Sequence, residues 1–169
     1  ILRLNPKGGD LIIAVEGYGG VQPMMELIDN KPFEFASKYG VKPEDFSGTG
    51  AVDVTITRPL LEFFDQSRIL YAVTGQFENV KAPFSVGEHA LGDGFVTLVA
   101  NKDGMSIKGP VSIGPWKTDL SWQETFDFGA TPTVYRVEGP IDRDTLDGFG
   151  VGLREYLGGT ANLTIDATG

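Results

Sequence analysis

The chain has 169 residues, of which 41% are apolar, with 14 Lys and Arg against 23 Asp and Glu, one His, 23 Gly and no Cys. A chain of this length buries enough surface for a hydrophobic core, and without Cys it cannot form disulfide scaffolds, zinc ribbons, iron–sulfur sites or Cys nucleophiles. Its net charge of -9 disfavours nucleic acid as a partner, because binding to phosphates depends on clustered Lys and Arg.

No window of the sequence approaches the roughly 20 apolar residues of a membrane-spanning helix, and the longest uncharged apolar run, residues 11–15, has the length of a strand. The sequence begins at Ile1 without a signal-peptide pattern and ends within a turn-like segment. We therefore expect a piece of a longer protein, a single segment over residues 1–169 in which residues 1–32 are a candidate tail of a preceding unit.

Short strands separated by turns dominate the pattern of the chain. Over residues 51–57 apolar and polar residues alternate, which places Val52, Val54 and Ile56 on one face of a half-buried strand. Residues 101–104 have the composition of a tight turn, so we expect residues 95–100 and 105–108 to pair antiparallel. Further strands are predicted over residues 69–76, 91–100, 111–113, 116–125 and 133–138.

The strand over residues 116–123 has one apolar face, formed by Trp116, Leu120 and Trp122 with Thr118 between them. Two short helices are predicted over residues 32–40 and 142–150, and Asp142 or Asp144 is the expected N-cap of the second. Each predicted helix is followed by a similar motif, a Gly and then a strand of alternating residues, and the two motifs are about 110 residues apart. This indicates an internal repeat of the kind that stacks into long arrays.

Residue patterns that carry catalysis or metal binding are weak in this sequence. His89 is the only histidine, lies in a Gly-flanked loop and has no Gly-x-Ser-x-Gly partner motif, so we expect it to be exposed and without a catalytic role. The acidic residues within 142–148 depart from a calcium loop at three key positions, and helix capping explains them better. We therefore expect no enzymatic activity, no metal and no cofactor.

Several short sequence motifs occur in an order that resembles a known family. The motifs are GTGAVDVTI at residues 48–56, RPL at 58–60, YAVTGQFENV at 71–80, GMSIKG at 104–109, TDLSW at 118–122 and YRVEGPID at 135–142. In this order they resemble the DUF3971 region of the AsmA-like proteins of the YhdP type, from about residue 33 to the end of the chain.

The resemblance implies a periplasmic segment of a large protein anchored in the inner membrane of a Gram-negative bacterium. It implies a non-enzymatic, bridge-like phospholipid carrier that takes acyl chains in a hydrophobic groove, with neighbouring segments of the same chain as its other partners. The sequence does not say which face of each strand lines the groove. The lipid-facing candidates are Val52, Val54, Ile56, Tyr71, Val73, Phe95, Ile107, Trp122, Val137, Leu163 and Ile165.

The expected architecture is mainly β (α+β): a strongly twisted, curved antiparallel sheet with short helices near residues 21–40 and 142–157 on one side or end, and unpaired edge strands at both termini. Two alternative functions remain open at this point. A structural or adhesive β module predicts a closed sandwich with both sheet faces packed. A carbohydrate-active domain requires the rings of Trp116 or Trp122 to be exposed beside a pair of carboxyl groups.

Overall fold

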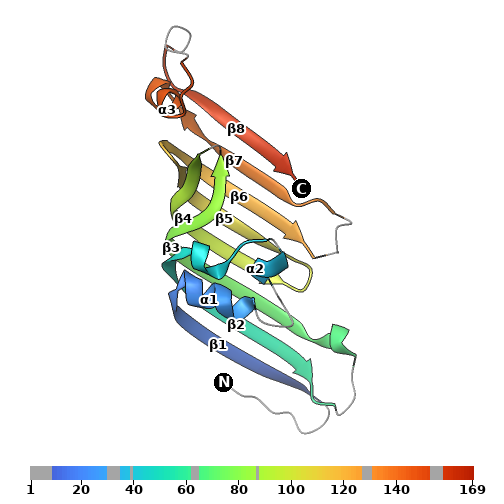
Figure 1. Cartoon of the computed structure of the whole chain (residues 1–169). Coiled ribbons are helices and arrows are strands. Elements are labelled where there is room, and N and C mark those ends of the chain that lie inside the picture. Colours follow the sequence, from blue (N-terminus) through green and yellow to red (C-terminus); the bar gives the residue numbers. More distant parts are fainter. Residues whose placement is uncertain are drawn as a thin grey trace.

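The computed structural model describes residues 9–29, 35–38, 40–61, 65–86, 88–126, 131–152 and 158–169, and these form one antiparallel sheet with short helices. The eight strands lie side by side in the order in which they occur in the chain. The sheet curls without closing, so that β1 and β8 are its two edges (Figure 1). The strands are β1 (Asp10–Gly20), β2 (Ser47–Pro59), β3 (Leu70–Val86), β4 (His89–Asn101), β5 (Gly104–Ile113), β6 (Trp116–Thr125), β7 (Val134–Ile141) and β8 (Ala161–Thr168).

This arrangement confirms the mainly β architecture, and it refines several strand boundaries. The predicted hairpin is present, because Ala100 of β4 pairs with Met105 of β5 across the turn at residues 101–104. The two short strands predicted over 105–108 and 111–113 are one continuous strand, β5. β1 pairs with β2 along its whole length, from Asp10 opposite Pro59 to Gly20 opposite Thr49, so the N-terminal region joins the same sheet as the rest.

A row of backbone irregularities crosses the sheet and bends it. The pairing registers shift next to Gly48 in β2, between Phe77 and Val80 in β3, and between Gly92 and Thr97 in β4. Asn79 and Asp93 lie at these shifts with positive φ angles of 54° and 48°, as expected for bulged residues. Because bulges increase twist and bending, the ends of β3 and the start of β4 turn away from the line of the remaining strands (Figure 1).

Helices α1 (Val21–Ile28) and α2 (Phe35–Lys38) lie on the same side of the sheet (Figure 1). Val21 of α1 is buried in a cluster with Val80, Val96 and Val111, and Met25 packs against that cluster. Hydrogen bonds connect the two helices: the backbone N–H and the hydroxyl of Ser37, in α2, donate to the carboxylate of Asp29, at the end of α1, at 2.7 and 2.8 Å. The core of the molecule therefore lies between α1 and the bent part of the sheet.

An aromatic ring packs directly on glycines in this part of the sheet. Gly50 of β2 pairs with Phe77 of β3, and Gly75 lies two residues before Phe77. A Cβ atom added at Gly50 would overlap the Phe77 ring and lie 2.7 Å from the carbonyl oxygen of Gln76. The missing side chain at Gly50 is therefore what allows the Phe77 ring to lie on the sheet.

The third helix, α3 (Arg143–Gly148), has the predicted Asp142 cap. The Asp142 carboxylate accepts hydrogen bonds from the backbone N–H of Thr145 at 2.9 Å and from its hydroxyl at 2.7 Å. These bonds lower the pKa of Asp142 below its ordinary value of 3.8, because they stabilise the charged form. The expected helix over residues 32–40 appears as α2, and its predicted start at residues 32–34 lies outside the described residues.

The cap predicts how α3 responds to acid. Because the folded pKa of Asp142 is depressed, its contribution is present above the unfolded pKa of 3.8 and is lost as the pH falls through the lower folded pKa. We expect the NMR shift of the Thr145 amide to titrate with a midpoint below 3.8 in the natural chain and to stay flat through this range in Asp142→Asn. A midpoint at or above 3.8 in the natural chain would contradict the cap.

Candidate binding face

One face of the sheet is apolar across all eight strands, and we call it the apolar face. Residues that pair directly in antiparallel strands point to the same side, so the register identifies its members. One row crosses every strand and contains Gly17, Val52, Gly75, Leu98, Ile107, Trp122, Tyr135 and Ala167. A neighbouring row contains Val15, Val54, Val73, Ala100 and Met105.

The opposite face is mostly polar. The residues that lie between the two apolar rows in each strand point to this face. They form a row of Glu16, Asp53, Thr74, Val99, Ser106, Gln123 and Val134. Arg136 of β7 also lies on this face, where it binds Asp166 of β8 at 2.6 Å. The apolar face is therefore the one that packs the core, although Ile12, Tyr18 and Val99 on the opposite face are 38%, 82% and 55% exposed.

Helix α1 covers only part of the apolar face. Val96 and Val111 lie beneath it and are 7% and 4% exposed. Ile107 packs against this cluster; away from it, Val54 and Val73 are half-buried, and towards the sheet edges Val15 is 52% exposed and Ile165 is 39% exposed. Partly exposed apolar side chains therefore lie beside the covered core in β1 to β4, whereas Met105 of β5 and Trp122 of β6, in the same two rows, are each 7% exposed.

Ten of the eleven lipid-facing candidates lie on the apolar face. They are Val52, Val54, Ile56, Tyr71, Val73, Ile107, Trp122, Val137, Leu163 and Ile165. Phe95 is separated from them, because its neighbour Val96 pairs with Phe77 on the apolar face and Phe95 therefore points to the other side, 46% exposed. The structure thus brings ten of these side chains together on one surface and places Phe95 on the opposite one.

The sequence interpretation missed the part of the apolar face that β1 contributes. Leu11, Ile13 and Val15 pair with Arg58, Ile56 and Val54 of β2 and so extend the apolar face to the edge of the sheet. Ile12 and Ala14, between them, are apolar as well, so the sequence of this strand does not alternate and gives no signal of which residues face inwards.

Both tryptophans are buried in the structure. Trp116 is 2% exposed, and its indole N–H donates to the carbonyl oxygen of Pro140 at 3.0 Å. Trp122 is 7% exposed and lies between the rings of Phe84 and Tyr135, with ring centroids 5.7 and 5.5 Å away. Neither ring is open for stacking on a sugar, so the exposed platform that a carbohydrate-active domain requires is not formed by these residues.

A small polar group lies at the end of the apolar face. Glu124 of β6 pairs with Met105, and its carboxylate accepts a hydrogen bond from the hydroxyl of Thr133, which precedes β7. The pKa of the Tyr135 phenol is raised, first because the ring is partly buried and second because the Glu124 charge is near. The sequence offers Glu124 only as one of several acids on or near strands that could form a carboxylate pair, and nothing in the pattern distinguishes it from the others.

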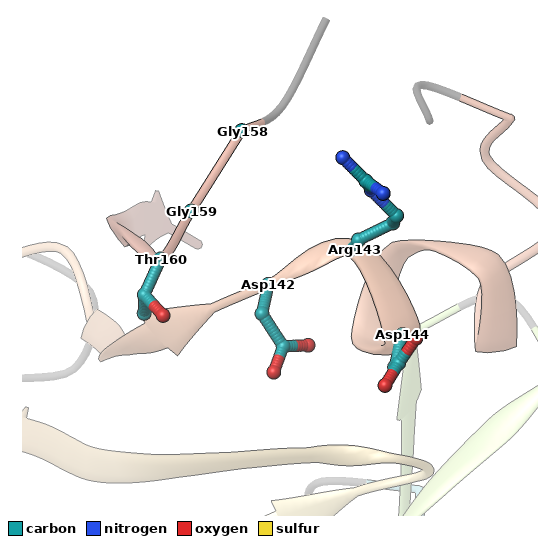
Figure 2. A pocket seen from close by; sticks show the side chains of 6 residues that line it. All are labelled: Asp142, Arg143, Asp144, Gly158, Gly159 and Thr160. Carbon is teal, nitrogen blue, oxygen red and sulfur yellow. The ribbon is translucent and has the colours of Figure 1, made fainter. Parts of the chain in front are cut away.

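The acidic segment around α3 borders a shallow, solvent-open depression. Figure 2 shows Asp142, Arg143 and Asp144 on one side of it and Gly158, Gly159 and Thr160 on the other. Asp142 is already engaged as the helix cap. Within the described ranges no three His, Asp or Glu side chains are placed to hold a metal ion.

His89 is part of the packing at the start of β4. It is half-buried rather than freely exposed as predicted, and its ring meets that of Phe149 edge to face at a centroid distance of 4.8 Å. The two rings join the β3–β4 hairpin to the segment that follows α3. This contact gives the histidine a structural role.

The fold and the face define a class of protein: an open, curled antiparallel meander with one continuous apolar face that helices cover only in part (Figure 1). Comparison of the chain with protein families, with curated proteins and with solved structures finds no match. In the part of the chain that the structure describes, none of the helices has the length and apolar character needed to cross a membrane.

Proposed function

We propose that the apolar face binds the acyl chains of phospholipids, as one non-enzymatic segment of a longer carrier protein in a bacterial cell envelope. The observation that carries this proposal is the row of partly exposed apolar side chains formed by Val15, Val54 and Val73, which lies beside the covered core of an unclosed sheet. Each methylene group that moves from water onto such a surface contributes up to about 0.8 kcal/mol, so a diacyl lipid needs no polar anchor to bind.

The open edges of the sheet support a carrier in preference to a structural β module. A structural module of the kind considered above packs both faces of its sheets in a closed sandwich, whereas here a single sheet leaves part of its apolar face uncovered. Exposure of a row of apolar side chains is unfavourable unless a ligand or partner covers it. Lipid tails match it because they are apolar, flexible and able to follow a curved surface.

The proposal is tested by incubating the 169-residue chain with vesicles of dioleoyl phosphatidylcholine, separating the protein and recording its native mass spectrum. We expect species that carry one or more intact phospholipids, and we expect glycerophosphocholine, which has the headgroup without the chains, to bind no better than a sugar of similar size. Protein that emerges free of lipid, or that binds glycerophosphocholine equally well, would overturn the proposal.

A further inference from the structure

Charged side chains are almost absent from the apolar face. Among the strand residues that the structure describes, the register places two on it, Arg58 in β2 and Glu124 in β6. Arg58 is exposed near the end of its strand, whereas Glu124 is half-buried beside Met105 and close to Tyr135. A carboxylate at this position is unfavourable unless its hydrogen-bonding capacity is used.

The hydrogen bonds of Glu124 are only partly satisfied within the described residues. The Thr133 hydroxyl donates to Oε2, and no donor from the described part of the chain is assigned to Oε1. A carboxylate accepts several hydrogen bonds and donates none, so the group that completes this site must be a donor. A cationic donor suits it best, because hydrogen bonds between opposite charges are the strong ones.

The charge of the surrounding protein favours the same kind of group. The chain carries a net charge of -9, and the ammonium of Lys102, on the nearby β4–β5 turn, is already bound to Asp103 at 2.8 Å. The other charged side chain of this face, Arg58, lies four strands away in β2, so the net charge of the chain and the Glu124 carboxylate favour a positive group over an anionic headgroup at this position.

From these observations we infer that Glu124 receives the primary ammonium group of a zwitterionic phospholipid such as phosphatidylethanolamine, whose acyl chains lie on the apolar face. This inference rests on the proposed function and adds the headgroup class to it. The acyl chains contribute most of the binding, and Glu124 selects between headgroups at the end of the apolar face. Phosphatidylglycerol with the same chains offers only neutral hydroxyl donors, and its net charge is of the wrong sign.

The test compares phosphatidylethanolamine, phosphatidylglycerol and diacylglycerol, all with dioleoyl chains, in competition for the chain by native mass spectrometry. We expect the natural protein to prefer phosphatidylethanolamine over phosphatidylglycerol by about tenfold, as one charge-assisted hydrogen bond provides. In Glu124→Gln the preference should fall to about twofold or less, while diacylglycerol binds as before. The amide keeps an acceptor for Thr133, and thermal unfolding reports whether the variant is folded.

Glu138→Gln is the matched control, because Glu138 lies on the opposite face in β7 and its replacement changes the net charge by the same amount. It should leave the headgroup preference unchanged. Equal loss of preference in both variants, or a preference that survives in Glu124→Gln, would overturn the inference and leave the proposed function standing. Failure of all three lipids to bind the natural protein would overturn the proposed function and this inference together.

Discussion

Gly50→Ala should lower the free energy of unfolding by about 2 to 4 kcal/mol, because the added methyl group meets a packed ring and a strand backbone. The Phe77 ring lies where the new Cβ would be, and the Gln76 carbonyl oxygen is 2.7 Å from it. Either the ring leaves the sheet and opens a gap in the cluster beneath α1, or β2 and β3 move apart. Chemical denaturation of the natural and variant chains measures the difference.

Gly19→Ala is the matched control for this substitution. Gly19 pairs directly with Gly50 on the same face of the sheet, yet no atom lies within 4 Å of a Cβ added there. We expect its free energy of unfolding to stay within about 0.5 kcal/mol of that of the natural chain. If the two alanine variants were equally stable, the packing of Phe77 on Gly50 would not be an important contact in the fold.

The parts of the fold that the sequence predicts are those with strict alternation. In β2, Val52, Val54 and Ile56 alternate with polar residues, so both the strand and its inward face follow from the sequence, and the same holds for Trp116, Leu120 and Trp122 in β6. The turn at residues 101–104 is equally local, because its Asn, Asp and Gly have strong turn preferences. These features are set by residues that are close in sequence, so they can be predicted from the sequence alone.

The bend of the sheet depends on contacts that are distant in sequence. Asn79 and Asp93 form bulges in the β3–β4 hairpin. Both residue types tolerate positive φ angles, but they are equally common in turns, so the sequence does not distinguish a bulge from a turn at these positions. Phe95 shows the consequence. Val96, Leu98 and Val99 follow it, so apolar residues occupy both faces of this part of β4, and the pattern alone does not say which side Phe95 faces.

The candidate binding face was predictable as a set of residues but not as a surface. The sequence identifies apolar positions in separate strands, whereas their continuity comes from the register, in which Val54, Val73 and Ala100 are direct neighbours. The sequence also does not predict how exposed these apolar side chains are, because their exposure depends on how far α1 extends over the sheet. Val96 is buried by that helix, and Val73, in the neighbouring strand, is not fully covered.

A negative charge in the middle of the apolar face should abolish most lipid binding. Val73 is half-buried there between Val54 and Ala100, and the next residue, Thr74, is exposed on the opposite face. Val73→Asp places a carboxylate where acyl chains would lie, so binding requires either its desolvation or the loss of several methylene contacts. Since 1.4 kcal/mol corresponds to a factor of ten, loss of even two methylene contacts weakens binding about tenfold.

The affinities of Val73→Asp and of its control Thr74→Asp for dioleoyl phosphatidylcholine, measured beside that of the natural chain, test the account most directly. Val15→Asp joins them, because Val15 is 52% exposed on the same face and its substitution leaves the packed core intact. We expect Val73→Asp to lose tenfold or more in affinity, Val15→Asp to lose less, and Thr74→Asp to bind like the natural chain. Equal affinities for Val73→Asp and Thr74→Asp in folded protein would contradict the assignment of lipid to the apolar face.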